Sequence, residues 1–202
     1  AGEIIRQALE AETVHPGFHR ILAENLVDRG DLKTAVEEFE KVWELSETLE
    51  QRTEVDARIF NVLRAHAGED ALGEDRRRHR RLGAGASETE AWAELWAFYR
   101  DLKARARSRP TPELRYRTAW WAIRILDYDE ASRHLAALHN PRNPTLAYEE
   151  LFLELGERRA NQGLVQRQLE LIAVINPDRE EEAMIRKAQM RLKLDYEDEA
   201  FR

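Results

Sequence analysis

Apolar residues recur at helical spacing along the chain, most regularly between residues 18 and 45. A first set falls three or four positions apart, on one face of an α-helix: Phe18, Ile21, Leu22 and Leu26. A second set follows after a polar break: Ala35, Val36, Phe39, Val42 and Trp43. Between them, Gly30 suits a left-handed helix C-cap, and Asp31 can cap the next helix. The pattern predicts two amphipathic helices joined by a tight turn.

Candidate helix starts recur at a nearly constant interval. Each places a capping residue or a proline ahead of an apolar set: Pro16 and Thr48, then Pro112, Pro144 and Pro177. Neighbouring starts lie 32 or 33 residues apart, except that Thr48 and Pro112 are separated by twice that interval. Gln51 can complete a capping box with Thr48. One helix pair cannot bury both of its apolar faces alone, so the recurrence predicts pairs that pack on their neighbours. The predicted fold class is all-α, an array of helix pairs; an ordinary helical bundle is the alternative for any single pair.

The chain is predicted to form one array over residues 1–202. Its expected units are the end of a preceding unit, four units, and a partial one: 1–15, 16–47, 48–110, 111–142, 143–175 and 176–202. The second of the four is nearly two periods long, yet only two helices are clear in it, roughly Leu49 to Ala67 and Glu88 to Arg107. Residues 68–86 between them are interpreted as an insertion, with a degenerate extra repeat as the alternative.

The amino-acid composition limits the classes of protein to which the chain can belong. Charged residues make up 35% of the chain and apolar residues 43%, a helix-rich profile without a run of about 18 apolar residues that would span a membrane. The absence of cysteine excludes disulfides, thiol catalysis and cysteine-bound metals. A net charge of −7 argues against general nucleic-acid binding.

The polar residues do not indicate a catalytic or metal site. His15 and His19 are separated by Pro16, and His134 and His139 do not share a helical face. The sequence contains no glycine-rich phosphate loop, no GxSxG and no HExxH motif. We therefore expect a protein that is not an enzyme and that has no cofactor and no bound metal.

The main charged feature is a run of arginines in the insertion: Arg76, Arg77, Arg78, Arg80 and Arg81. From Arg76 to Arg117 the chain has twelve basic and five acidic residues. This balance indicates an electropositive patch for an acidic partner, with a mobile, solvated loop as the alternative. Nearby, adjacent Trp120 and Trp121 point about 100° apart on a helix. Either their helix is contacted on two sides, or one of them lines a binding surface.

The spacing of the first helix pair resembles a tetratricopeptide repeat. The residues that carry the resemblance are His19, Leu22-Ala23, Leu26, Gly30-Asp31, Ala35 and Phe39. After Pro112, Leu126 stands in place of the turn glycine; after Pro144, Leu155-Gly156 and Gly163 keep the family's spacing. The resemblance implies a right-handed superhelical solenoid of antiparallel helix pairs.

The same resemblance implies a concave surface that holds a partner. The family's groove-facing positions carry over to Arg20, Glu24, Tyr116, Trp120, Arg124, Glu157, Asn161 and Gln189. The degenerate, Arg- and Trp-rich units look like the arrays of bacterial envelope proteins, including Pel-type exporters of exopolysaccharide. That likeness would imply a periplasmic scaffold that docks a polymer-modifying enzyme.

Together these observations predict a non-catalytic scaffold for protein–protein interaction. An acidic partner protein would dock around Tyr116, Trp120 and Arg124 or on the arginines of the insertion. A module that binds an anionic polymer or ligand through those arginines is the alternative. Self-association is a third possibility, since the ends of stacked helix arrays expose apolar faces.

Overall fold

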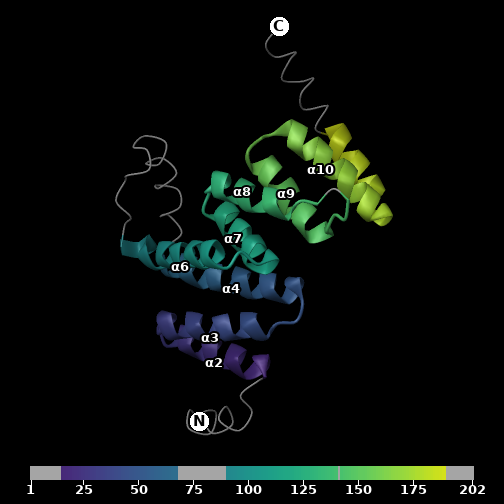
Figure 1. Cartoon of the computed structure of the whole chain (residues 1–202). Coiled ribbons are helices and arrows are strands. Elements are labelled where there is room, and N and C mark those ends of the chain that lie inside the picture. The colour runs from purple at the N-terminus through teal and green to yellow at the C-terminus, as the bar shows by residue number, and fades with distance from the viewer. Residues whose placement is uncertain (1–14, 68–89, 141, 190–202) are drawn as a thin grey trace. The chain divides into compact units, whose positions relative to one another are not determined.

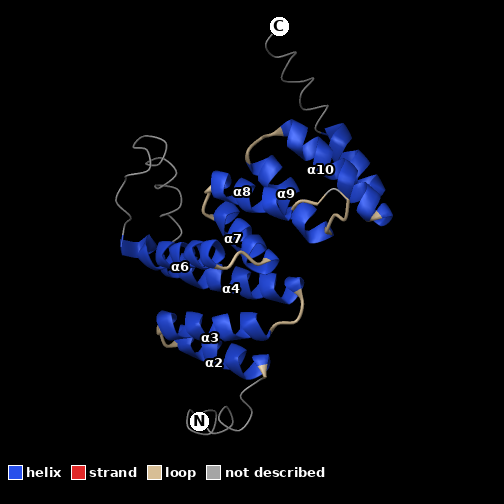
Figure 2. Cartoon of the chain, in the orientation of Figure 1, coloured by secondary structure: helices blue, strands red, loops and turns tan. Residues whose placement is uncertain are grey.

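A computed structural model describes residues 15–67, 90–140 and 142–189 (Figure 1). In these segments the chain forms helices joined by short loops, and none of them contains a β-strand (Figure 2). The prediction of an all-α fold is thereby confirmed. The chain divides into two compact units, Ala1–Asp101 and Leu102–Arg202, and the division falls inside a helix.

The first unit is built on the helices that the apolar pattern predicts: α2 (Pro16–Asp28), α3 (Leu32–Leu45), α4 (Leu49–Ala67) and the first part of α6 (Glu90–Ser108). Helix α3 packs against both α2 and α4. The buried Trp43 donates its indole N–H to Asp56 Oδ2 at 2.9 Å, which ties α3 to α4. At the start of α4, Thr48 Oγ1 accepts from Gln51 N (3.2 Å) while Gln51 Oε1 accepts from Thr48 N (3.3 Å), so the predicted capping box is confirmed.

The second unit holds the remaining elements: the end of α6, α7 (Pro112–Arg124), α8 (Tyr128–Leu138), α9 (Leu146–Arg158), α10 (Gln162–Ile175), the 3₁₀ turn η1 (Pro177–Arg179) and helical residues 180–189. Helix α7 packs against α8 and α9 and is the most enclosed of them, since every residue from 116 to 123 is buried. Both Trp120 and Trp121 are therefore buried, which requires neighbours on more than one side of α7.

Two of the predicted helix starts differ in detail from the structure. Thr111 caps α7 as expected, with Oγ1 accepting from Leu114 N at 3.3 Å. Helix α9, in contrast, begins after Thr145 and not at Pro144, because the preceding residues close a turn in which Asn143 N donates to Asn140 O (3.1 Å). Pro177 opens a 3₁₀ turn before helix resumes at residue 180.

Three helix pairs share one turn construction. These pairs are α2 with α3, α7 with α8, and α9 with α10. In each turn one residue adopts a positive φ: Gly30 (78°), Leu126 (70°) and Ala160 (52°). The residue that follows donates its backbone N–H to the carbonyl five positions earlier, as in a Schellman cap: Asp31 to Leu26 (3.0 Å), Asp127 to Ala122 (2.8 Å) and Asn161 to Gly156 (2.9 Å). The side chain of that same residue then caps the next helix. One residue thus ends the first helix and begins the second.

The turn of the third pair lies three residues before the position that the sequence indicates. Gly163 lies inside the first turn of α10, and Ala160 takes the left-handed position instead. The other glycine of that pair, Gly156, permits close packing, because a Cβ there would lie 3.1 Å from Val165 Cγ2. In the first two pairs four alanines are fully buried: Ala23, Ala35, Ala119 and Ala131. The glycine spacing was therefore a misleading guide to the turn.

Replacing Ala160 with glycine should stabilise the protein by about 0.5–1 kcal/mol. Ala160 is exposed and holds a positive φ that an L-residue adopts at a cost, whereas glycine adopts it readily. The matched reverse change, Gly30→Ala, should destabilise by a similar amount at the equivalent turn. Chemical denaturation of both variants measures these differences, and a destabilised Ala160→Gly protein would contradict the left-handed turn.

Candidate functional site

The predicted partner-binding residues of the first unit lie on α2. The side chain of Arg20 is exposed, as expected for a contact residue. Glu24 is half-buried and accepts two bonds from Arg58 of α4: Arg58 Nε donates to Oε1 at 2.9 Å, and Nη2 contacts Oε2. This fork-to-fork pair joins the first and third helices of the unit. A partner that used Glu24 would have to compete with Arg58.

Tyr116 and Trp120, predicted to line a groove, are buried in the second unit at 9% and 4% exposure. The Tyr116 ring packs on Tyr148 with centroids 5.7 Å apart. Arg124 lies over the Trp120 ring, 3.5 Å from its centroid, and its Nη1 is 3.5 Å from Glu154 Oε2. Burial lowers the pKa of Arg124, and the charge of Glu154 opposes that shift. The two aromatic side chains are buried, so this place offers a partner little direct contact.

The remaining predicted contact residues have separate surroundings. Asn161 caps α10 through a bond from Leu164 N at 3.1 Å, while Gln189 is exposed in the last described helix. Glu157 lies 3.6 Å from Arg186 Nη1. The arginines of the insertion lie outside the described residues: Arg76, Arg77, Arg78, Arg80 and Arg81.

Glu157 also lines a pocket of about 230 Å³ in the second unit. Its lining includes the apolar side chains of Leu153 and Ile172. Its walls carry four carboxylates and two guanidinium groups: Glu150, Glu154, Glu157, Glu182, Arg179 and Arg186. The excess of negative charge makes this pocket unsuitable for an acidic partner.

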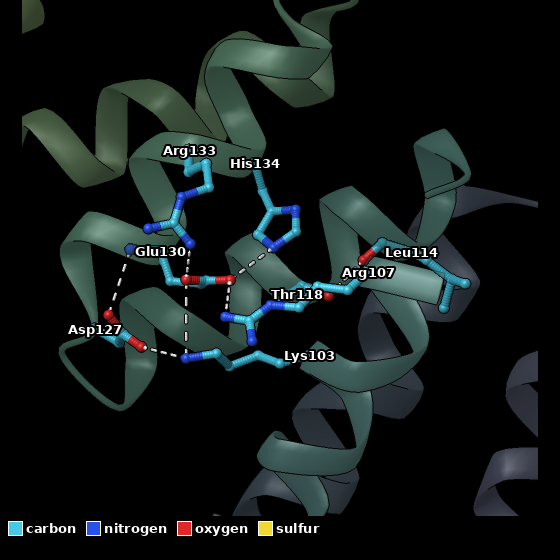
Figure 3. Close-up of polar contacts among 8 residues, drawn as sticks. All are labelled: Lys103, Arg107, Leu114, Thr118, Asp127, Glu130, Arg133 and His134. Atoms are coloured by element: carbon cyan, nitrogen blue, oxygen red, sulfur yellow. Dashed lines mark hydrogen bonds and ion pairs between the residues drawn. The ribbon is translucent and has the colours of Figure 1, made fainter. Parts of the chain in front are cut away.

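A different cluster in the second unit gathers basic side chains around a buried carboxylate, Glu130 of α8 (Figure 3). Arg133 Nη1 contacts Glu130 Oε2, and Arg107 Nη2 of α6 lies 3.6 Å from Oε1. Lys103, also on α6, has its Nζ 3.8 Å from Oε2 and 3.2 Å from Asp127 Oδ2. We call these residues the Glu130 cluster: Lys103, Arg107, Asp127, Glu130, Arg133 and His134.

The members of the Glu130 cluster differ sharply in their access to solvent. The Glu130 side chain is 6% exposed, and those of Arg107 and Arg133 are 64% and 63% exposed. The carboxylate is thus inside the unit while the guanidinium groups face outward. Three basic side chains against two carboxylates leave the cluster with positive charge at its surface.

His134 lies on the buried side of the Glu130 cluster. Its Nε2 lies 3.3 Å from Glu130 Oε1, and its Nδ1 is buried without a hydrogen-bond partner in the described structure. Burial lowers the pKa of His134, Glu130 opposes that change, and the nearby charges of Arg115 and Arg133 lower it further. The net direction is downward, so the neutral imidazole is favoured at this place.

The sequence carries two separate signals of this cluster. Lys103 and Arg107 are four residues apart in the basic stretch of α6, and Glu130 precedes Arg133 and His134 by three and four positions. The positive balance between Arg76 and Arg117 indicates basic surface, but it does not separate the insertion from α6. Only the packing of α6 beside the start of α8 brings the two sets together.

The described residues also bear on metal binding and on membrane-spanning helices. They contain no group of three or more His, Cys, Asp or Glu side chains placed to hold a metal ion. Among the helices of the described segments, none is both long enough and apolar enough to cross a membrane. The ionisable groups of the Glu130 cluster contact one another as ion pairs.

The lowered pKa of His134 predicts a pH dependence of stability. Unfolded histidine takes up a proton near pH 6.5, while buried His134 resists it, so this residue favours folding above pH 6.5. That contribution is lost as pH falls from about 6.5 through the lower pKa of the folded state. The variant His134→Leu should therefore lose less stability than the wild type between about pH 7.5 and 5. Denaturant unfolding across this range checks the difference; equal losses in both proteins would contradict it.

A scan against family models, a search of curated proteins and a search of solved structures each found no match to this chain. The resemblance to tetratricopeptide repeats therefore rests on the residues, spacings and turns given above.

Proposed function

We propose that this chain is a non-catalytic, tetratricopeptide-like scaffold that docks an acidic segment of a partner protein. In this proposal the helix pairs form a solenoid of antiparallel pairs, and the docking surface is the exposed side of the Glu130 cluster. The observation that carries the proposal is the exposure of Arg107 and Arg133 beside a buried carboxylate.

The repeated turn supports the scaffold half of the proposal. In three helix pairs the first helix ends with the same backbone hydrogen bond, and the second helix begins with the same type of side-chain cap. Sequence repeats of this kind produce extended surfaces made of nearest-neighbour contacts. Such surfaces suit the binding of a peptide or a protein domain better than the enclosure of a small substrate.

Charge supports the docking half. Arginine donates paired N–H groups that match the oxygens of a carboxylate, and two arginines here point outward from one place. The pocket lined by Glu157 has the opposite balance, and Tyr116 and Trp120 are buried. The described surface that best fits an acidic partner is therefore the Glu130 cluster. We move the expected docking site there from the groove around Tyr116, Trp120 and Arg124.

Reversing the charge of Arg107 and Arg133 should weaken partner binding at least about tenfold, equivalent to about 1.4 kcal/mol. The variant Arg107→Glu/Arg133→Glu replaces two attractions with two repulsions at the proposed surface. The control variant Arg142→Glu/Arg167→Glu makes the same change in net charge at two exposed arginines outside the cluster. Affinity capture from an extract of the source organism, with the three proteins side by side, identifies proteins that the cluster variant loses and the control keeps.

The captured proteins decide between this function and its alternative. A protein with an acidic segment that binds the wild type and the control, but not the cluster variant, supports the scaffold. Equal capture by all three proteins would contradict docking at this cluster. Cluster-dependent retention of an anionic polysaccharide, with no protein, would favour the polymer-binding alternative.

A further inference from the structure

The contacts of Glu130 do more than neutralise a buried charge. A carboxylate removed from water is costly unless it is paired, and Glu130, at 6% side-chain exposure, is surrounded by groups from two helices. Arg133 and His134 reach it from α8, and Lys103 and Arg107 reach it from α6 (Figure 3). The two carboxylate oxygens therefore hold side chains of α6 and α8 in fixed relation to one another.

The two arginines have donors to spare after this contact. A guanidinium group carries five N–H donors in a planar fork, and a single carboxylate contact uses only part of them. Arg107 and Arg133 approach different oxygens of Glu130, so they flank the same carboxylate with most of each side chain in solvent. Without Glu130, each would be a long, mobile chain that loses rotamer freedom on binding.

We propose that Glu130 is a positioning residue that pre-organises Arg107 and Arg133 as a clamp for the carboxylates of an acidic peptide segment. This inference rests on the proposed function, because it explains how the same surface would hold its partner. The clamp favours carboxylates because both arginines already bind one within the unit. A strongly charged polyanion such as nucleic acid is disfavoured by the net charge of −7.

The change Glu130→Gln sets two physical effects against each other. It removes a negative charge, so long-range attraction for an acidic peptide increases. It also removes the group that orients both arginines, so more rotamer freedom is lost when the peptide binds. The peptide would meet the exposed ends of Arg107 and Arg133, so its carboxylates would lie farther from Glu130 than from the two guanidinium groups, and the gain in attraction is the smaller effect. We therefore expect weaker binding, by about fivefold, despite the more favourable net charge.

The test uses a defined probe and the whole chain. Fluorescence anisotropy measures binding of a fluorescein-labelled decapeptide of alternating glutamate and serine to four proteins. These are the wild type, Glu130→Gln, Arg107→Glu/Arg133→Glu, and the control Glu181→Gln. The control removes one negative charge, as Glu130→Gln does, but at an exposed glutamate outside the cluster. We expect loss of binding in the double variant, about fivefold weaker binding in Glu130→Gln, and unchanged or slightly tighter binding in Glu181→Gln.

The outcomes separate the two proposals. If Glu130→Gln binds as tightly as the wild type or more tightly, while the double variant loses binding, the positioning role is overturned and the docking surface stands. If the double variant binds as well as the wild type, or the wild type does not bind the peptide, the docking surface itself is overturned.

A second variant keeps the test decisive if Glu130→Gln does not fold. Glu130→Asp keeps the charge but shortens the side chain by one methylene, which moves the carboxylate away from the arginines. Weaker peptide binding by a folded Glu130→Asp protein supports positioning, since its net charge is unchanged; wild-type affinity overturns it. ¹⁵N relaxation of the arginine Nε–H groups gives an independent readout, with greater mobility of Arg107 and Arg133 expected in either Glu130 variant.

Discussion

The backbone bond that closes each helix pair is the constraint on which the described fold depends. The N–H after the left-handed residue donates back across the end of the first helix, at 2.8–3.0 Å in all three pairs. The side chain of the same residue accepts from the second helix, so the direction of the chain changes within two residues. Neither helix of a pair buries enough apolar surface alone, and this turn places their apolar faces against one another.

One copy of this turn also builds the candidate site. Asp127 caps α8 with Oδ1, which accepts from Glu130 N at 3.3 Å, while its Oδ2 contacts Lys103. The cap therefore fixes the first turn of α8 and one basic residue of α6 at the same time. Glu130 follows three residues after the cap, where a negative charge is favoured by the helix dipole. Arg133 and His134 come one turn later on the same side of α8, which places them around the carboxylate.

Helix positions could be predicted from the sequence wherever local rules decide them. Apolar periodicity and caps located α2, α3, α4 and α7, and the capping box of Thr48 and Gln51 formed as expected. The turn before α10 was misplaced because glycine marks either a left-handed residue or a close helix contact. At Gly156 the contact with Val165 is the reason for glycine, and Ala160 takes the left-handed position at some cost.

The site was harder to predict because its members depend on tertiary packing. An apolar face signals burial, but it does not say whether an aromatic residue lies in a core or in a groove; Tyr116 and Trp120 are in the core. Charged residues give still less local information, since Glu130 looks like any solvent-facing glutamate of an amphipathic helix. The arrangement of α6, α7 and α8 alone decides that this carboxylate is buried and that basic side chains of α6 contact it.

Stability alone does not account for Glu130. The residue at the same place after the cap is Thr34 in α3 and Leu164 in α10, and both helices begin with the same capping bond. The turn therefore does not require an acid there. Burying a carboxylate with its cations is also no more stabilising in general than apolar packing of similar volume. What the carboxylate adds at this one turn is a fixed orientation for two arginines that otherwise face solvent, and orientation of that kind matters for binding rather than for folding.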